Sequence, residues 1–260
     1  MSGYGIVGLG RIGRRLATRL PGARAVLVHP ARAADAARLV GGDAVSTSLE
    51  GFLARKPAVA VECASAEVLA AMGPALLAAG VDLVPLSLTA LADPTVERHL
   101  MAAAVAGPGR IEIAPGAIGT LDLLATAREE GLRRVVYRQV KSPAMWALTP
   151  AAALADFGSI RGRHVFFKGS VREVARRLPD NLNSAVGVAL AGLGLDGTEV
   201  ELVADPAISE TAHELEIHAA PGNAVLRLGG RDVPPDGDPV DYTTFSLIRL
   251  LKRRQARVAI

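Results

Sequence analysis

The stretch Ile6-Val7-Gly8-Leu9-Gly10-Arg11-Ile12-Gly13 decides the fold of this chain, because three glycines at G-x-G-x-x-G spacing follow directly on a short apolar run. An amphipathic segment continues to about Leu20, so the order is strand, tight turn and helix. Gly8 makes the turn, Gly10 lets the backbone approach a pyrophosphate, and Gly13 lets the helix pack closely on the strand. Amides at a helix start favour anions, so the stretch predicts a dinucleotide-binding site; an ordinary glycine-rich turn is the alternative.

Length and composition indicate a globular protein that acts on small molecules. The chain has 260 residues, of which 50% are hydrophobic and 3% aromatic, which is enough to build two domains. The net charge of +3 is dispersed, and the few aromatic residues leave little material for stacking nucleic-acid bases. The cluster Lys252-Arg253-Arg254 fits the last turn of a helix better than a nucleic-acid site. We therefore expect weak attraction for anionic small molecules and no nucleic-acid partner.

The single cysteine and the hydropathy pattern bear on the cellular compartment. Cys63 alone cannot form an internal disulfide or a cysteine-rich zinc site, and it favours a reducing environment. The first residues lead straight into a strand without the features of a signal peptide, and no apolar run reaches the roughly 18 residues of a membrane helix. The expectation is a soluble, cytoplasmic protein that binds neither a metal nor a membrane.

The first part of the chain alternates strands with helices. Strands are expected at 4–7, 24–28, 58–62, 82–86 and 110–114, and helices at 31–39, 67–79 and 94–106. This alternation is typical of parallel β-α-β units. Residues 1–115 are therefore predicted to form a Rossmann-type, doubly wound parallel sheet that binds the dinucleotide.

The pattern after Pro115 is less regular. Helices are expected at 119–130, 171–178 and 183–193, and strands at 133–140, 164–167, 198–204, 212–219 and 224–228. This order predicts an α+β catalytic, substrate and dimerisation domain over residues 116–239. Residues 234–239 read as a loop. A final amphipathic helix at 242–255, with Phe245, Ile248 and Leu251 on one side, is expected in a last segment, 240–260, that packs back on the first domain.

The residue that meets the adenosine ribose decides between NAD and NADP. In NAD-preferring domains of this type, an acidic residue about 20 positions after the glycines takes the ribose 2′-hydroxyl. His29 stands at that place, so the group that repels a 2′-phosphate is missing. Arg32, together with Arg11, can supply positive charge. The sequence favours NADP or tolerance of both cofactors, while a solvated Arg32 with the ribose held by backbone or water is the equally weighted alternative.

One histidine is placed as a candidate acid or base. In the segment 212–219, period-two alternation puts His213, Leu215 and Ile217 on one face of a strand, and Glu214, Glu216 and His218 on the other. An inward histidine at the mouth of a strand can serve as general acid or base. Alone, such a residue is more often a satisfied core histidine.

Several segments together resemble the L-aspartate dehydrogenase family over about residues 4–255. They are Gly8-Leu9-Gly10-Arg11-Ile12-Gly13, Val61-Glu62-Cys63-Ala64-Ser65, Gly116-Ala117-Ile118-Gly119-Thr120-Leu121-Asp122, Phe167-Lys168-Gly169-Ser170-Val171, Pro179-Asp180-Asn181-Leu182-Asn183 and Ala204-Asp205-Pro206-Ala207 with His213. The resemblance implies that His213 is the catalytic acid/base. It also implies cofactor contacts at Ala117 and Asn183, and at Arg11, Ile12, Cys63 and Ala64 beside the glycines. Asn183 also reads as a helix N-cap.

The resemblance implies a reaction and a set of substrate contacts. L-aspartate would be oxidised by hydride transfer to NADP or NAD, giving iminoaspartate and then oxaloacetate and ammonia, in support of pyridine-nucleotide biosynthesis or general aspartate metabolism. A dicarboxylate needs cations or donors, for which Lys141, Thr120 and Ser142 are the candidates and Lys168 a poorer one. Asp205 or Asp122 is expected to orient His213 or a helix start. Relatives of this plan are commonly homodimers.

Departures from the family pattern leave other functions open. Pro115, Thr120 and Thr211 stand where the family usually has Ser, often Gly and commonly Asn. They put the substrate in more doubt than the cofactor. The alternatives are an imine or carbonyl reductase of related plan, such as one resembling dihydrodipicolinate reductase, and a dinucleotide-binding protein without catalysis.

Overall fold

The computed structural model describes residues 3–178, 182–229 and 241–258. The chain divides into two compact units: unit 1 comprises Met1–Gly116 with Thr243–Ile260, and unit 2 comprises Ala117–Tyr242. The loop expected at 234–239, the expected boundary between 239 and 240, and residues 179–181 of the family-like segment lie outside the described residues.

Unit 1 is built on a parallel sheet of five strands in the order β3-β2-β1-β4-β5. The strands are β1 (Tyr4–Val7), β2 (Ala25–Leu27), β3 (Val45–Ser46), β4 (Val59–Glu62) and β5 (Asp82–Pro85). Every neighbouring pair is parallel. The order reverses between β1 and β4, as in doubly wound dinucleotide-binding sheets. The predicted Rossmann-type sheet is confirmed.

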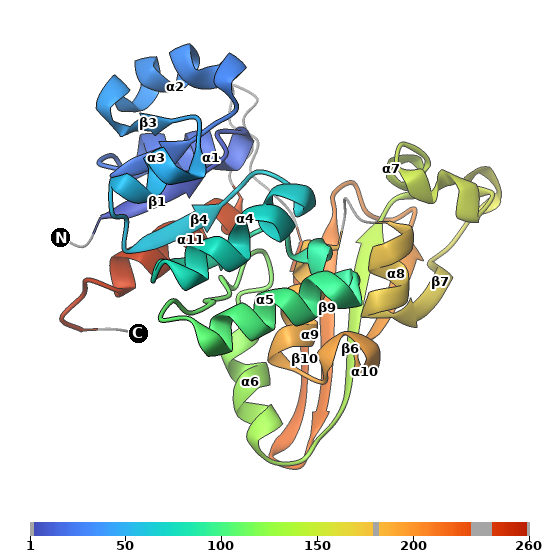
Figure 1. Cartoon of the computed structure of the whole chain (residues 1–260). Coiled ribbons are helices and arrows are strands. Elements are labelled where there is room, and N and C mark those ends of the chain that lie inside the picture. Colours follow the sequence, from blue (N-terminus) through green and yellow to red (C-terminus); the bar gives the residue numbers. More distant parts are fainter. Residues whose placement is uncertain (1–2, 179–181, 230–240, 259–260) are drawn as a thin grey trace. The chain divides into compact units, whose positions relative to one another are not determined.

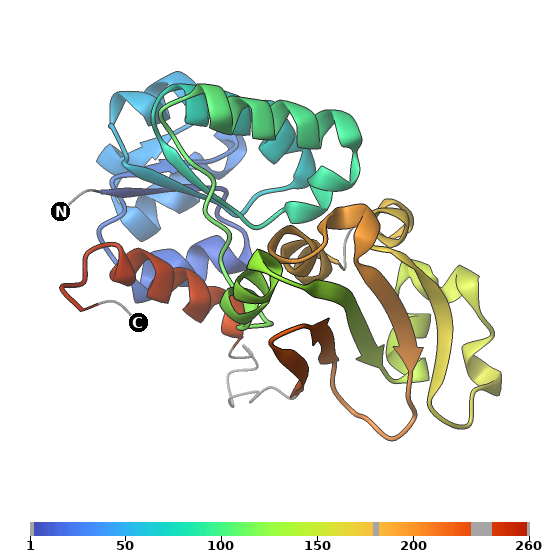
Figure 2. The same cartoon turned by 90° about the horizontal axis from the view of Figure 1, so that it is seen from below.

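Helices cover both faces of this sheet. They are α1 (Arg11–Arg19), α2 (Ala33–Val40), α3 (Leu49–Ala54), α4 (Ala66–Ala78), α5 (Pro94–Ala106) and α11 (Tyr242–Arg253), with short 3₁₀ turns at Pro30–Arg32, Gly42–Ala44 and Leu88–Ala92. Leu16 of α1 and Leu247, Leu250 and Leu251 of α11 join Ile6 of β1 in one buried cluster. Figure 2 shows α11, in red, beside the sheet on the side opposite the green α5. The last helix thus completes the core of unit 1.

Two expectations for unit 1 are wrong, and two short elements were not predicted. Residues 110–114 form no strand: Leu83 exchanges two backbone hydrogen bonds with this segment, and the pairing stops at a single bridge to Ile111. The chain then turns away toward Pro115, which has no amide hydrogen to donate. The short β3 and α3 were not expected, because two and six residues are too few for a clear periodicity. Phe245 is 37% exposed, so it does not share the buried side of α11 with Ile248 and Leu251.

Unit 2 is an α+β unit with a mixed sheet in the order β10-β9-β6-β8-β7, as expected. Its strands are β6 (Leu132–Lys141), β7 (His164–Ser170), β8 (Glu199–Ala204), β9 (Ala212–Ala219) and β10 (Gly222–Gly229). Only β6 and β8 run parallel, and the other pairs are antiparallel. The helices are α6 (Leu121–Glu129), α7 (Pro143–Ala147), α8 (Val171–Arg177), α9 (Asn183–Ala191) and α10 (Gly194–Gly197), with 3₁₀ turns at Pro150–Leu154 and Phe157–Ser159.

The two faces of this second sheet differ in chemistry. The inner face contacts α6 and α8, and α8, α9 and α10 lie in front of the sheet in Figure 1. The opposite face, here called the charged face, carries ion pairs across neighbouring strands. Arg138 of β6 pairs with Glu201 at 2.6 Å and with Glu216 at 2.8 Å, and Arg134 pairs with Glu199 at 2.7 Å. Strand alternation therefore separates a helix-covered side from a polar one.

Candidate active site

A cavity of about 630 Å³ lies at the carboxyl end of β1 and β2 in unit 1. Its size falls within the roughly 300–1,000 Å³ of small-molecule sites. Open α/β sheets bind ligands at this edge, near the point where the strand order reverses. Of the sequence-predicted cofactor residues, the structure brings five to its lining: Gly8, Gly10, Arg11, Arg32 and Ala64.

The glycine turn has the geometry that a dinucleotide cradle needs. Gly8 has a φ of +91°, and a Cβ there would lie 2.8 Å from the Cα of Ala64. A Cβ on Gly13 would lie 2.2 Å from the carbonyl oxygen of Gly8, so only glycine lets α1 approach β1 so closely. Gly10 precedes α1, and its Cβ would meet nothing nearer than the carbonyl oxygen of Cys63 at 3.9 Å. The open space beside Gly10 and the first-turn amides of α1 fit a pyrophosphate.

The charge of the cavity is positive. Arg11, Arg14 and Arg32 line it, together with His29 and Thr47, and no Asp or Glu is among its described lining residues. His29 caps the 3₁₀ turn after β2, since its Nδ1 accepts a hydrogen bond from the amide of Ala31 at 3.3 Å. Arg14 was not singled out from the sequence. Its position three residues after Arg11, on the same helix face, was the available signal.

The loop after β4 is held against the glycine turn by a buried carboxylate. Glu62 is 1% exposed and accepts hydrogen bonds from the amides of Ala64 at 2.7 Å and Ser87 at 3.0 Å, and from the hydroxyl of Ser87 at 2.9 Å. Desolvation raises the pKa of Glu62, although these bonds oppose the shift. Burial, and the charge of Glu62, raise the pKa of the half-buried Cys63 thiol. Cys63 is thus a neutral neighbour of the cradle rather than a reactive thiolate.

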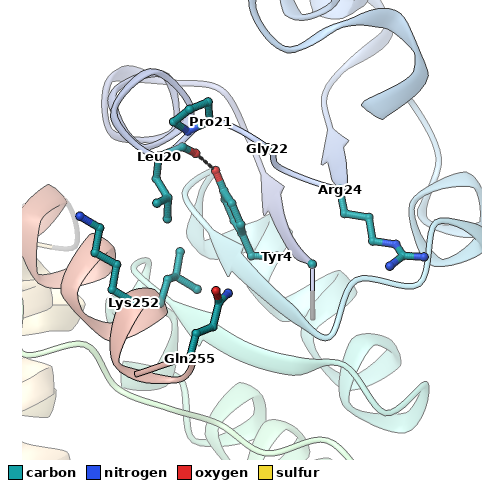
Figure 3. A pocket seen from close by; sticks show the side chains of 9 residues that line it. Tyr4, Leu20, Pro21, Gly22, Arg24, Lys252 and Gln255 are labelled. Atoms are coloured by element: carbon teal, nitrogen blue, oxygen red, sulfur yellow. Dashed lines mark hydrogen bonds between the residues drawn. The ribbon is translucent and has the colours of Figure 1, made fainter. Parts of the chain in front are cut away.

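A second cavity of unit 1, of about 370 Å³, lies at the opposite end of β1. Figure 3 shows Tyr4 in this cavity, with its hydroxyl donating to the carbonyl of Leu20 and with Lys252 and Gln255 of the last helical turns nearby. Burial raises the pKa of Tyr4 to about 12, so the phenol stays neutral. This cavity lies at the amino edge of the sheet, where α/β folds do not place their cofactors.

His213, the predicted acid/base, lies near the start of β9 in unit 2. Leu215 and Ile217 are buried, which agrees with the predicted alternation. The Nδ1 atom of His213 is 2.6 Å from the hydroxyl of Tyr137 on β6. Tyr137 is fully buried, and it also hydrogen-bonds the side chain of Ser184 on α9. Burial raises the pKa of Tyr137, so a neutral phenol fixes one edge of the imidazole.

Tyr137 is a hydrogen-bond partner of His213 that was not predicted from the sequence. It precedes His213 by 76 positions, and only the pairing of β6 with β9 brings the two side chains together. Asp205, which was expected to orient either His213 or a helix start, holds the turn after β8. Its carboxylate accepts from the amide of Ala207 at 2.9 Å and faces Arg163 at 3.5 Å.

The predicted substrate contacts lie in three different settings within unit 2. Lys141 is 8% exposed at the end of β6, with its ammonium 4.7 Å from the ring centroid of Trp146. The hydroxyl of Ser142 accepts from the amide of Met145 at 3.3 Å and so caps α7. The buried hydroxyl oxygen of Thr120 has no hydrogen-bond partner in the described part of the chain. Lys168 lies on the charged face, 2.8 Å from Glu199.

The remaining predicted contacts are placed as follows. Ala117 is half-buried at the start of unit 2, and Ile12 and Gly13 lie in the first turn of α1. Asn183 is the exposed first residue of α9, whose N-cap is Leu182. The expectation that Asn183 itself caps the helix is therefore wrong, because Asn183 is already the first helical residue. Asp122 lies in the first turn of α6, where a negative charge favours the helix start.

The described residues contain neither a metal-binding cluster nor a membrane-spanning helix. No group of three or more His, Cys, Asp or Glu side chains among them could hold a metal ion. Within the same residues, no helix has both the length and the apolar character needed to cross a membrane.

A Rossmann-type unit with a basic cradle, joined to an α+β unit that pairs a buried tyrosine with a half-buried histidine, defines a nicotinamide-dependent oxidoreductase. Residues 8–114 match the model of the homoserine dehydrogenase NAD-binding domain, and residues 122–254 match that of the aspartate dehydrogenase C-terminal domain. The chain belongs to the L-aspartate dehydrogenase family.

Relatives and a solved structure agree with this assignment over nearly the full length. The L-aspartate dehydrogenase of Cupriavidus necator is 36% identical over 264 positions, covering 98% of each chain. That of Serratia proteamaculans is 34% identical over 251 residues, covering 95% of each. The aspartate dehydrogenase structure from Thermotoga maritima covers 100% of this chain and 99% of its own, with a TM-score of 0.80 at 23% identity, which shows the shared fold.

Proposed function

We propose that this protein oxidises L-aspartate with NADP or NAD, releasing oxaloacetate and ammonia, and that it also catalyses the reverse reductive amination. The observation that carries the proposal is the relationship to L-aspartate dehydrogenases, which extends over nearly all of this chain and of its relatives. The reaction consumes one water and one oxidised cofactor for each aspartate, and it yields oxaloacetate, ammonium, reduced cofactor and one proton.

Unit 1 holds the cofactor in this proposal. The residues proposed to contact it are Gly8, Gly10, Arg11, Ile12, Gly13, Arg32, Cys63 and Ala64 from unit 1, with Ala117 and Asn183 from unit 2. When bound, the nicotinamide supplies the two-electron chemistry by accepting the hydride from the substrate carbon. The glycine turn and the helix start orient the pyrophosphate, and the positive cavity favours its charge.

His213 of unit 2 is the proposed acid/base. It takes a proton from the substrate amine, or from the water that adds to the imine carbon, and it later returns a proton to the departing nitrogen. A group that alternates between base and acid must accept and release a proton without moving away from the reacting nitrogen. The hydrogen bond between Tyr137 and Nδ1 supports this role, because it fixes the orientation of the imidazole ring.

Lys141, Thr120 and Ser142 are the proposed substrate contacts. The buried ammonium of Lys141 lies on the aromatic ring of Trp146, a setting in which one carboxylate of a ligand would be bound in place of water. Thr120 supports the proposal through its buried hydroxyl, which has no hydrogen-bond partner among the described residues. The hydroxyl of Ser142 accepts a bond as a helix cap and can still donate one to a substrate oxygen.

The finer proposal for the cofactor is a preference for NADP. Three arginines line the cavity, and His29 stands where a carboxylate would otherwise repel the 2′-phosphate. Arg32, the last residue of the 3₁₀ turn after β2, is the proposed phosphate ligand.

The change in nicotinamide absorbance tests the activity directly. L-aspartate is offered with NAD and with NADP in separate assays, and oxaloacetate plus ammonia with each reduced cofactor. A panel of other amino and oxo acids accompanies them, because Pro115, Thr120 and Thr211 depart from the family pattern. Turnover of another panel member in place of aspartate would identify a different imine or carbonyl reductase. Cofactor binding without any turnover would identify a silent binding protein.

We also propose that the protein works as a homodimer in the reducing cytoplasm. In support of this, β10 is an edge strand of the second sheet and carries the exposed Val225, and an edge strand can pair with another chain. Light scattering behind a sizing column measures the mass, and two chains per particle is the expected result. A single chain per particle across the working concentration range would contradict it.

A further inference from the structure

The inner face of the second sheet is apolar except near one end of β6. Side chains at alternate positions of β6 share this face, and those at its carboxyl end are Tyr137, Gln139 and Lys141. The register of β6 with β9 places Gln139 directly opposite His213. Residues opposite each other on antiparallel strands point to the same side, with Cβ atoms about 4.5–5.5 Å apart. Gln139 and the proposed acid/base are therefore immediate neighbours.

Gln139 is a buried polar residue whose acceptor is unused. Gln139 is 5% exposed, and its Oε1 atom has no hydrogen-bond partner among the described residues. Burying such a group lowers the stability of the fold, because the carbonyl loses its hydrogen bonds to water and gains none in the protein. The neighbouring phenol of Tyr137 does not serve it, since that hydroxyl lies against Nδ1 of His213. Buried orphans of this kind call for an explanation, and a ligand is one.

The chemistry of the orphan restricts its ligand. An amide carbonyl accepts an N–H or O–H and repels a carboxylate oxygen. The substrate proposed above carries two carboxylates and one amino group, so only the amino group can donate to Gln139. His213 must exchange protons at or beside this same nitrogen, within reach of its imidazole. A nitrogen bound next to His213 therefore meets an acceptor that is already in place.

We propose that the Oε1 atom of Gln139 binds the amino group of the substrate and holds that nitrogen beside His213. This inference rests on the proposed function, since it requires an amino acid substrate. It makes Gln139 a residue that distinguishes an amino dicarboxylate from a dicarboxylate without an amino group. In the reverse direction, the same carbonyl receives the N–H of ammonia or of the imine.

The substitution Gln139→Met tests the proposal, because methionine matches the length and shape of glutamine but has no carbonyl. The KM for L-aspartate is expected to rise about tenfold to a hundredfold, the loss typical of a hydrogen bond to a charged group. Succinate, which has both carboxylates and no amino group, serves as the probe of the rest of the site. Its inhibition constant is expected to stay at the wild-type value, as is the dissociation constant of the cofactor.

Two further variants keep the test decisive. Gln139→Leu removes the same acceptor with a different shape, so the proposal still applies if the methionine variant fails to fold. Gln255→Met makes the same chemical change at the exposed glutamine after α11 and is expected to behave as wild type. Wild-type KM for aspartate in a folded Gln139 variant would overturn the inference, as would a parallel loss of succinate binding. If the wild-type protein itself did not turn over aspartate, the proposed function would fail first, before any variant was compared.

Discussion

The cofactor cradle of unit 1 and the surroundings of the proposed acid/base in unit 2 are built in different ways. The cradle is made of backbone: Gly8, Gly10 and the start of α1 lie within a few consecutive residues. The second neighbourhood is made of side chains that β6 and β9 bring together, with Tyr137 and His213 far apart in the sequence. A cofactor-binding turn can thus form from consecutive residues, whereas the Tyr137 and His213 pair forms only when β6 and β9 align in the correct register. Substitutions in unit 2 should therefore change turnover without changing cofactor binding, and substitutions in the cradle should change cofactor binding.

The largest separation is expected from His213→Ala. Loss of the acid/base should lower kcat by about 10²- to 10⁴-fold, because proton transfer typically contributes that much. The dissociation constant of the cofactor should stay unchanged, since the cradle residues are untouched. Steady-state kinetics and cofactor titration by fluorescence measure both quantities. Wild-type turnover in this variant would remove His213 from the mechanism.

Tyr137→Phe tests whether the phenol acts through the imidazole. We expect kcat to fall about tenfold, an effect typical of residues that orient a functional group. The phenol remains neutral, so a protonated imidazole donates to it, and hydrogen bonds to charged groups are the stronger ones. Because the phenol bonds a ring nitrogen that takes up and releases protons in the proposed mechanism, its loss should move the acidic limb of the kcat/KM profile. A lower rate with an unmoved pH profile would indicate a packing defect instead.

Arg32→Ala probes the side-chain contribution to the otherwise backbone-built cradle. The kcat/KM with NADP should fall about tenfold, the loss of one charge-assisted contact, while the value with NAD stays constant. Arg38→Ala is the matched control, because this neighbouring arginine of α2 pairs with Asp35 and does not line the cavity. Equal losses with both cofactors would show that Arg32 does not read the 2′-phosphate.

Two glycine substitutions within the cradle should have different effects, one on the free energy of unfolding and the other on dinucleotide affinity. Gly13→Ala forces a Cβ to within 2.2 Å of the Gly8 carbonyl and should lower the free energy of unfolding by about 1–3 kcal/mol. Gly10→Ala meets no described atom closer than 3.9 Å, so stability should hold while dinucleotide binding weakens. Denaturant unfolding and cofactor titration of both variants provide the measurement. Identical behaviour of the two variants would contradict this division.

The smallest effect is expected on the charged face. Hydrogen bonds from Arg134 and Lys168 lower the pKa of Glu199 from 4.5 to about 2. A carboxyl whose pKa is lower in the folded state stabilises the fold above its unfolded pKa, and this contribution disappears as the pH falls from about 4.5 to 2. Glu199→Gln should remove that part of the acid sensitivity, and it should cost at most about 1 kcal/mol at neutral pH. Denaturant unfolding across this pH range checks both statements.

The sequence was sufficient where structure depends on neighbouring residues. The glycine spacing predicted the turn and the helix start, and the regular alternation of strands and helices predicted the Rossmann-type sheet. Alternation predicted the buried side of β9 around Leu215 and Ile217. The strand prediction for 110–114 was wrong because charged and apolar residues alternate there as in a strand, although only one bridge forms.

Register is what the sequence could not supply. The positions of Tyr137 and Gln139 beside His213 depend on how β6 aligns with β9, and a shift of one residue would have turned both side chains to the other face. The alternation that marks Lys141 as inward also marks Gln139 and Tyr137, two and four positions earlier. That signal was present, but a glutamine in a strand carries no chemical signature until its burial and its missing partner are known.

Because α11 lies at the end of the sequence, the core of unit 1 can be completed only late in synthesis. Leu247, Leu250 and Leu251 fill the same core as Ile6 and Leu16, and Arg254 pairs with Asp82 and Glu112. A ribosome therefore delivers the last piece of the cofactor-binding unit only after all of unit 2 has been synthesised. Until α11 is made, the apolar side chains of Ile6 and Leu16 lack the leucines that complete their cluster.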